Sequence, residues 1–240
     1  MSENVASSDV SALAEKFATA DPETILKWSI ETYHPRLSLA CSFGAEDMVL
    51  VDMLSKIAPR AKVFSLDTGR LPPETYELMA TVQRKYHNLD LQILYPQTEA
   101  VQNMVQSKGI NLFYDSVENR KLCCHVRKVE PLQRALAGLD AWITGIRRDQ
   151  TANRSTMQVV EWDGANNLVK INPLINWSWE QVWRYIRQNF VPYNALHDRN
   201  YPSIGCAPCT RAVQAGEDPR AGRWWWEQGN QECGLHVLRS

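Results

Sequence analysis

The sequence predicts an α/β fold with a doubly wound, mainly parallel sheet. Two observations lead to this prediction. Short apolar segments typical of strands alternate with longer segments in which apolar residues recur every three or four positions, as on one face of a helix. Several expected strands also run into a turn of glycine and polar residues before the next helix begins. This alternation is typical of a parallel sheet covered by helices on both faces.

Length and charge limit the classes of function. At 240 residues, the chain is long enough for one large domain with a substantial core. Its formal net charge of −1 excludes a broad attraction to nucleic acid or to an anionic membrane. Residues 1–9 lack the basic and apolar regions of a secretory signal, and no apolar run approaches a membrane span. We therefore expect a cytoplasmic protein with no nucleic-acid or membrane partner. The sequence leaves open whether it forms a homo-oligomer.

We expect three parts along the chain. Residues 1–35 are predicted to form a helical N-terminal appendage, because apolar residues between Val10 and Phe17 recur at helical spacing. Residues 36–211 are expected to form the main domain. Residues 212–240 are interpreted as a mobile tail, because the end of the chain is polar and punctuated by glycine.

The first expected strand begins at Leu37 and leads into a turn that contains Ser42 and Gly44, after which a helix begins. A strand that feeds a glycine turn and a helix N-terminus can bind an anion, because unpaired backbone N–H groups point outward there. The turn is not a Walker A loop, since no Gly-Lys-Ser/Thr follows. A plain joint between strand and helix is the alternative. Cys41 lies inside the strand and is interpreted as a core residue.

The second expected strand lies within residues 62–71, and a third lies at residues 89–94. Ligands of open α/β sheets bind beyond the carboxyl ends of the strands. The polar turn after the second strand therefore supplies four candidates for substrate binding: Asp67, Thr68, Gly69 and Arg70. The alternative is that Asp67 and Thr68 cap the next helix, which begins near Pro73.

The fourth expected strand begins at Ala141 and ends in a turn with Gly145, Arg147 and Arg148. Two arginines at a strand's carboxyl end are a candidate clamp for an oxyanion. Solvated surface arginines are the alternative. Further along, residues 157–171 predict a hairpin around Asp163-Gly164, and Ser178 predicts the cap of a helix.

Four cysteines form two pairs that lie far apart in the sequence: Cys123, Cys124, Cys206 and Cys209. Four thiolates are the usual ligands of a four-iron cluster or of a structural zinc. Zinc ribbons normally space each pair by two or more residues, so the adjacent pair favours iron–sulfur. A buried free pair with a separate redox Cys-x-x-Cys is the alternative.

The sixth cysteine, Cys233, stands apart in the polar C-terminal segment, three residues before His236. A lone cysteine near a terminus is a candidate nucleophile, and nearby cations favour its thiolate. Lys128, Arg220 and Arg223, together with His236, are candidates to supply that charge. A surface thiol without a role is the alternative.

The motif from Cys123 to Leu132, the later Cys-x-x-Cys and the final Glu232-Cys-Gly-Leu-His236 resemble the iron–sulfur branch of the assimilatory adenylyl-sulfate and phosphoadenylyl-sulfate reductases. The resemblance runs from about Cys41 to the C-terminus. It implies an adenine nucleotide α-hydrolase-like fold and one [4Fe–4S] cluster on the two cysteine pairs. The turn near Ser42 resembles a degenerate PP-loop, in which Phe43 replaces a glycine and Asp47 replaces the last serine.

The resemblance also implies a mechanism and the role of each candidate residue. Adenylyl sulfate binds at the carboxyl edge of the sheet, and Cys233 attacks its sulfur with His236 nearby. Thioredoxin or a similar dithiol then releases sulfite. The adenylate is held by Ser42, Gly44, Asp67, Thr68, Gly69, Arg70 and Gly145. The phosphosulfate is neutralised by Lys128, Arg147, Arg148, Arg220 and Arg223. Lys128 is expected between the cluster and the sulfate.

Three other functions stay open at this point. The substrate of the same enzyme class could be phosphoadenylyl sulfate, although the branch that uses it typically lacks the four cluster cysteines. A PP-loop enzyme that thiolates RNA with ATP is the second alternative, and the near-neutral charge argues against it. The third is a binding module that is stabilised by a structural zinc ion and whose tryptophans bind a partner.

Overall fold

The computed structural model describes residues 7–151 and 154–227. A six-stranded sheet forms its centre, in the order β3-β2-β1-β4-β6-β5. The first five of these strands pair in parallel, and β5 at the edge pairs antiparallel with β6. The strands are β1 (Leu37–Ala40), β2 (Lys62–Leu66), β3 (Asp90–Leu94), β4 (Ala141–Ile143), β5 (Val160–Asp163) and β6 (Leu168–Ile171).

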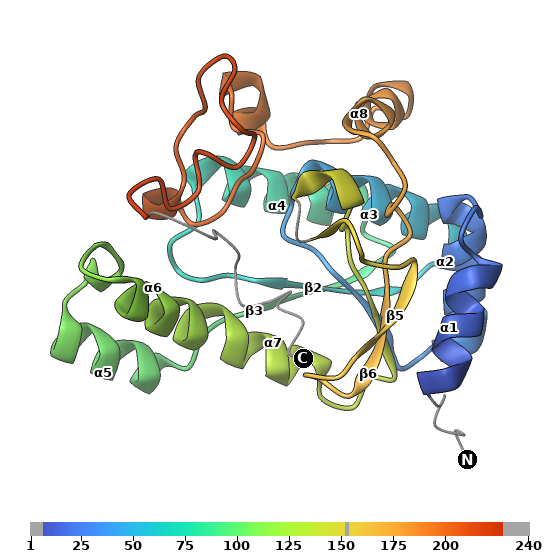
Figure 1. Cartoon of the computed structure of the whole chain (residues 1–240), viewed down its shortest axis with the longest axis horizontal. Coiled ribbons are helices and arrows are strands. Elements are labelled where there is room, and N and C mark those ends of the chain that lie inside the picture. The colour runs from blue at the N-terminus through green and yellow to red at the C-terminus, as the bar shows by residue number, and fades with distance from the viewer. Residues whose placement is uncertain (1–6, 152–153, 228–240) are drawn as a thin grey trace.

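Helices cover both faces of this sheet. Figure 1 shows α3 and α4 on one face and α5, α6 and α7 on the other. The predicted doubly wound, mainly parallel sheet is therefore confirmed. The helices are α1 (Ser7–Lys16), α2 (Pro22–Tyr33), α3 (Ala45–Ile57), α4 (Pro73–Lys85), α5 (Thr98–Lys108), α6 (Val117–Cys124), α7 (Glu130–Leu136) and α8 (Trp179–Gln188).

Local sequence signals explain where several helices begin. The Ser178 side chain accepts a hydrogen bond from the backbone N–H of Gln181, and the Gln181 side chain accepts one from the backbone of Ser178. This capping box satisfies two backbone donors at the start of α8, as predicted. Asp21 caps α2 in a similar way, through the backbone N–H of Thr24. Proline in the first turn of α4 suits the fixed φ of that position.

The helices α1 and α2 lie in the region predicted as an N-terminal appendage. Their apolar side chains do not form a separate core. Val10, Phe17, Ile25 and Leu26 are buried in the same cluster as the strand residues of the sheet. Truncation of this region would therefore expose part of the main core.

The hairpin β5–β6 is confirmed, although its turn is longer than a two-residue connection. Residues 164–167 form the turn, and Asn167 adopts a φ of +57°. The Asp163 carboxylate accepts hydrogen bonds from the backbone N–H groups of Ala165 and Asn166. Asparagine and aspartate support such turns because their side chains bond to the nearby backbone.

The order of the strands reverses between β1 and β4. The chain moves from β1 to β2 and β3 on one side, and β4, β6 and β5 lie on the other side. The loops after β1 and β4 therefore diverge, and open α/β sheets bind ligands in the crevice that this leaves. Among residues 7–151 and 154–227, no helix is both long and apolar enough to cross a membrane.

Candidate active site

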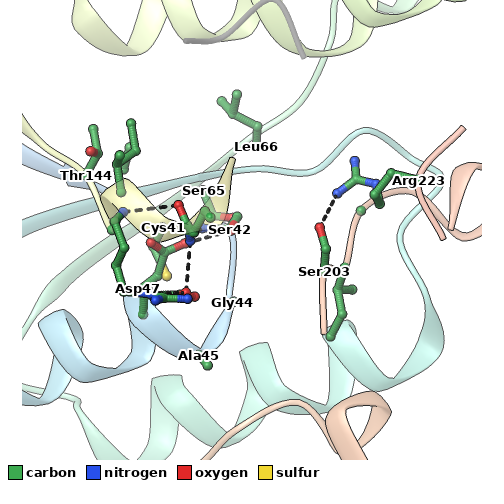
Figure 2. A pocket seen from close by; sticks show the side chains of 18 of the residues that line it. Cys41, Ser42, Gly44, Ala45, Asp47, Ser65, Leu66, Thr144, Ser203 and Arg223 are labelled. Carbon is green, nitrogen blue, oxygen red and sulfur yellow. Dashed lines mark hydrogen bonds and ion pairs between the residues drawn. The ribbon is translucent and has the colours of Figure 1, made fainter. Parts of the chain in front are cut away.

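A cavity of about 390 Å³ lies at the carboxyl ends of β1, β2 and β4, where the strand order reverses (Figure 2). This volume lies in the range typical of small-molecule sites. The loops that follow the three strands line one side. Lys128, residues 202–205, Pro219, Arg220 and Arg223 also belong to the lining. A cavity therefore lies at the edge of the sheet where the sequence predicts substrate binding.

The turn after β1 is closed by a carboxylate of the protein itself. Asp47 accepts hydrogen bonds from the Ser42 backbone N–H at 2.6 Å and from the Ser42 hydroxyl at 2.7 Å. Phe43 lies between them in the sequence, is buried, and adopts a φ of +61°. Burial raises the pKa of Asp47 to about 6, against the opposing effect of the Ser42 hydrogen bonds. The turn thus binds an internal anion in the position where a PP-loop would offer its N–H groups to phosphate.

Gly145 lines the cavity at the end of β4, and its missing side chain leaves room for Asp47. A Cβ atom at this position would lie 2.3 Å from Asp47 Oδ1 and 3.2 Å from the Asp47 backbone nitrogen. Glycine is therefore required here by the close approach of the loop that follows β1. The sequence predicted Gly145 as a substrate contact and did not reveal this packing role.

Of the four candidates after β2, only Thr68 lines the cavity. The Asp67 carboxylate accepts hydrogen bonds from the Gly69 backbone N–H and the Tyr76 hydroxyl, both within its own turn and helix. The Arg70 guanidinium points away from the cavity, because it donates to the carbonyl of Ile110. Neither Asp67 nor Thr68 caps α4, whose N-cap is Pro72. The contacts of Asp67 and Arg70 lie within the protein, so the structure gives no direct contact of these two side chains with the cavity.

The two arginines after β4 point in different directions. Arg147 lines the cavity, donates to Glu46 at 2.8 Å, and forms an ion pair with Asp149. Arg148 does not line it. Its side chain donates to the carbonyl of Met157 and to the side chain of Asn176. The structure therefore places only Arg147 of the two predicted arginines at the cavity, and the charge of Arg147 is already balanced by two carboxylates.

The structure adds cavity residues that the sequence analysis missed. Arg154 is 8% exposed, lines the cavity, and donates to the side chain of Gln150. His197 also lines the cavity and lies edge-on to the ring of Trp179. Burial lowers the pKa of His197, which favours a neutral imidazole. Arg154 follows β4 in the chain, so the preference of ligands for the carboxyl ends of strands could have predicted it. No sequence signal indicates that His197 lies near the ends of β1 and β4.

Basic side chains predominate in the lining. Figure 2 shows Ser203 and Arg223 on the other side of the cavity from Ser42 and Asp47. Arg223 donates to the Ser203 hydroxyl at 3.2 Å. Five basic residues line the cavity, against three acidic ones. The basic set is Lys128, Arg147, Arg154, Arg220 and Arg223, and the acidic set is Glu46, Asp47 and Asp149. Such a surface suits a ligand with more than one negative charge.

The two cysteine pairs meet beside this cavity. Cys206 and Cys209 are each 8% exposed, and Cys123 and Cys124 pack against the same apolar cluster. The Thr68 hydroxyl lies 3.2 Å from the Cys206 sulfur, so the cluster adjoins the turn after β2. Burial raises the pKa of the Cys209 thiol to about 12, and the positive charge of Lys128 opposes this effect. Pairs about 80 residues apart in sequence therefore come together in one apolar cluster.

A four-iron cluster and a single zinc ion would place different demands on these cysteines. In the described parts of the chain, no three His, Cys, Asp or Glu side chains form a group that could hold one metal ion. A zinc site draws four ligands onto one ion, whereas a [4Fe–4S] cluster distributes four thiolates over four irons. Buried thiolates also need a positive partner, which either metal would supply.

Lys128 lies between the cavity and the thiols. It belongs to a π-helical turn, His125–Val129, that joins α6 and α7. The backbone N–H of Glu130 donates to the carbonyl of His125, so the turn is wider than the α-helix expected from the spacing of Cys124 and Lys128. The side chain lines the cavity, and its charge acts on Cys209. Single π turns are frequent at functional sites.

Cys233 and His236 lie outside the described residues, so their positions in the site stay predictions. The last described residue is Glu227, six positions before Cys233.

Residues 36–212 match the family described as the phosphoadenosine phosphosulfate reductase domain. The chain belongs to this family. It is 53% identical over 198 residues to adenosine 5'-phosphosulfate reductase of Allochromatium vinosum, with 82% of this chain and 77% of that protein covered. It is 47% identical to the Neisseria meningitidis serogroup A protein of that name, with 94% and 91% covered.

A solved structure of the same family supports the fold. The phosphoadenylyl-sulfate reductase from Candida auris, in its phosphate complex, superposes with a TM-score of 0.76 at 32% identity. The match covers 89% of this chain and all of that chain. The family resemblance inferred from the cysteine motifs is therefore confirmed.

Proposed function

We propose that this chain reduces adenylyl sulfate to sulfite and AMP in sulfate assimilation. The observation that supports the proposal is the position of Lys128, which lines a basic cavity at the sheet's switch point and acts on the thiol of Cys209. The names of the relatives from Allochromatium vinosum and Neisseria meningitidis agree with it. The cytoplasmic location stays a prediction of the sequence.

The cavity residues bind and orient the substrate. The turn with Ser42, the Thr68 hydroxyl and the backbone at Gly145 border the region proposed for the adenylate. Lys128, Arg220 and Arg223 face the same cavity and offset the charge of the phosphosulfate. Arg154 lines the same cavity and belongs to this group of cations, although the sequence did not predict it.

The chemical step takes place at Cys233. Its thiolate attacks the sulfate sulfur, the bond between that sulfur and the bridging oxygen breaks, and AMP leaves with the electron pair. Cations near the phosphate favour this step because they stabilise the charge that grows on the leaving oxygen. The product on the enzyme is a cysteine S-sulfonate.

A dithiol protein such as thioredoxin completes the reaction. One of its thiolates attacks the Cys233 sulfur and expels sulfite, and the second thiol then reduces the mixed disulfide. The dithiol supplies both electrons, and Cys233 returns to its thiol form. Thioredoxin dependence and the S-sulfonate are parts of this proposal.

Cys123, Cys124, Cys206 and Cys209 would hold a [4Fe–4S] cluster. Such a cluster would close the long loop between the two pairs and would add to the electric field near Lys128. The residues of the chain perform the binding, orientation and thiol chemistry described above.

The test is a single turnover without reductant. The parent protein, incubated anaerobically with adenylyl sulfate, should gain one sulfonate on the Cys233 peptide and release one AMP, both read by mass analysis. Cys233→Ser should bind the nucleotide but form no adduct, because a serine hydroxyl is essentially un-ionised at neutral pH. Cys41→Ala is the matched control, since burial raises the pKa of the Cys41 thiol and disfavours its thiolate. An adduct on Cys41, or turnover by the serine variant, would contradict the proposal.

Phosphoadenylyl sulfate is the second candidate substrate, because the superposed Candida auris protein is a reductase of that nucleotide. The ratio of kcat/KM for the two nucleotides decides between them. We expect adenylyl sulfate to be preferred, since the cysteine pairs are typical of that branch. RNA thiolation is disfavoured, because Asp47 fills the turn that would bind the pyrophosphate of ATP.

A further inference from the structure

A buried ion pair joins the helix of the first cysteine pair to the last described residue. The Arg120 guanidinium in α6 donates to both carboxylate oxygens of Glu227, with Nε–Oε1 at 2.8 Å and Nη2–Oε2 at 2.7 Å. The side chains of Arg120 and Glu227 are only 4% and 6% exposed. Arg120 lies three residues before Cys123, and Glu227 lies six residues before Cys233. The pair thus connects the proposed cluster ligands with the segment that carries the proposed nucleophile.

Trp224 extends this contact toward the cavity. Its ring centroid lies 4.8 Å from the guanidinium carbon of Arg120 and 4.8 Å from that of Arg223. The Trp224 side chain is 1% exposed, and its φ of +44° is unusual for a bulky residue. Its backbone N–H donates to the carbonyl of Cys209, and its carbonyl accepts from the N–H of Glu227. The segment is therefore held against both cysteine pairs.

Stability alone does not explain this arrangement well. A buried ion pair often contributes no more to stability than apolar side chains of similar size, because both charges lose their hydration. A two-fold hydrogen-bonded pair does, however, fix the relative position of the two segments. Moving Glu227 away from Arg120 into an apolar environment would leave its charge unpaired, which is unfavourable.

We infer that Arg120 and Glu227 form a clasp that sets the anchor point of the C-terminal segment. The inference rests on the proposed function for the role of Cys233. Six residues span at most about 20 Å when fully extended. The clasp would therefore set an upper limit on the distance between the Cys233 thiol and α6. Arg120 and Glu227 are positioning residues, and neither is assigned a contact with the reacting atoms.

Release of the clasp should slow the intramolecular step without loss of substrate affinity. The effective concentration of a tethered group falls as its tether lengthens. For Glu227→Gln, we expect S-sulfonate formation at saturating adenylyl sulfate to be about tenfold slower, as for a misplaced reacting group. The substrate concentration that gives half the maximal rate should change by less than about threefold, or roughly 0.7 kcal/mol, because neither Arg120 nor Glu227 lines the cavity. Iron content should match the parent.

Two further variants separate the effect of losing the clasp from effects on folding and on charge in general. Arg120→Met with Glu227→Met replaces the pair by apolar side chains, a change that buried ion pairs often tolerate. It should fold and show the same slower step. Glu217→Gln is the matched control, because it breaks the similar two-fold pair with Arg211, at 2.8 and 3.0 Å, which is partly exposed and does not involve α6. It should keep the parent rate.

Amide hydrogen exchange gives a readout independent of chemistry. The N–H groups of Trp224 and Glu227 should exchange at least tenfold faster in Glu227→Gln and in the double methionine variant. Parent-like exchange together with a parent-like S-sulfonation rate in the double variant would overturn the clasp. If the parent protein forms no S-sulfonate at all, the proposed function fails, and the exchange rates alone then decide whether the clasp holds this segment.

Discussion

At the scale of single residues, the loop after β1 depends on one carboxylate and one missing side chain. Asp47 occupies the turn that resembles a PP-loop, and Gly145 leaves the space that Asp47 needs. A PP-loop that cleaves ATP must keep this turn open for pyrophosphate. Here the internal anion satisfies the backbone donors, so the cavity is shaped by protein groups before any ligand binds.

Gly145→Ala should destabilise the protein by about 1–3 kcal/mol, the usual cost of forcing an extra methyl group into a packed site. The added Cβ would lie 2.3 Å from Asp47 Oδ1, so the β1 loop must shift. Urea denaturation measures the change, and AMP affinity should fall with it. Gly164→Ala is the control, because its nearest neighbour would be 3.9 Å away. Equal unfolding midpoints for the two variants would contradict this packing role.

Asp47 should make stability depend on pH in a defined window. Its folded pKa is raised to about 6 from 3.8, mainly by burial. Below pH 4 both the folded and unfolded states hold the proton. As the pH rises toward 6, the unfolded state releases it first and is favoured. The free energy of unfolding should therefore fall by about 3 kcal/mol across this window, since two units correspond to roughly that amount.

The comparison with Asp47→Asn isolates this contribution. Asparagine does not titrate, so the variant should lose most of the decrease in stability between pH 4 and 6. Urea denaturation at intervals of half a pH unit measures it. Identical pH profiles for parent and variant would show that Asp47 has an ordinary pKa in the folded state.

At the scale of elements, the π turn between α6 and α7 determines how the cysteine helix meets the cavity. A regular α-helix would place Lys128 one turn from Cys124 on the same face. The wider turn changes this direction while it keeps α6 and α7 in one continuous helical run. The result is a cation that lines the cavity and also acts on Cys209.

Lys128→Ala should slow S-sulfonate formation by about 100-fold or more, the typical cost of removing a group aimed at developing charge. The fold should persist, since no core side chain is lost. Single-turnover kinetics and circular dichroism measure the two effects. Lys121→Ala on the exposed face of α6 is the matched control and should retain the parent rate. Equal rates for the two variants would remove Lys128 from the mechanism.

At the scale of the whole molecule, the sheet and the cysteine site depend on contacts between distant parts of the chain. The cavity is built from the ends of three strands, and its other side includes residues 202–205, Pro219, Arg220 and Arg223. Figure 1 shows the C-terminal described segment, coloured orange to red, on the side of the sheet where α4 and α6 begin. A metal cluster bound by the cysteines should therefore stabilise the sheet, the cavity and the C-terminal described segment together.

The anaerobically purified protein should be brown and contain about four irons per chain, as Cys₄ ligation of one [4Fe–4S] cluster requires. Cys124→Ser should lose iron and show a lower unfolding temperature, because metal binding that closes a long loop contributes to folding. Iron and labile sulfide analysis provides the measurement. A colourless protein with stoichiometric zinc would contradict the cluster assignment.

The sequence by itself determined the α/β class, most of the strands and helices, the cysteine pairs and the family. These features depend on local periodicity, caps and short motifs, which neighbouring residues specify. The tertiary structure alone decided which side chains of each turn reach the cavity. Thr68 and Arg147 face it, whereas Arg70 and Arg148 bind distant backbone carbonyls. Arg154, His197 and the Arg120–Glu227 pair also emerged only there. The direction of a side chain, and the charge that balances it, depend on partners that the fold brings from far along the chain.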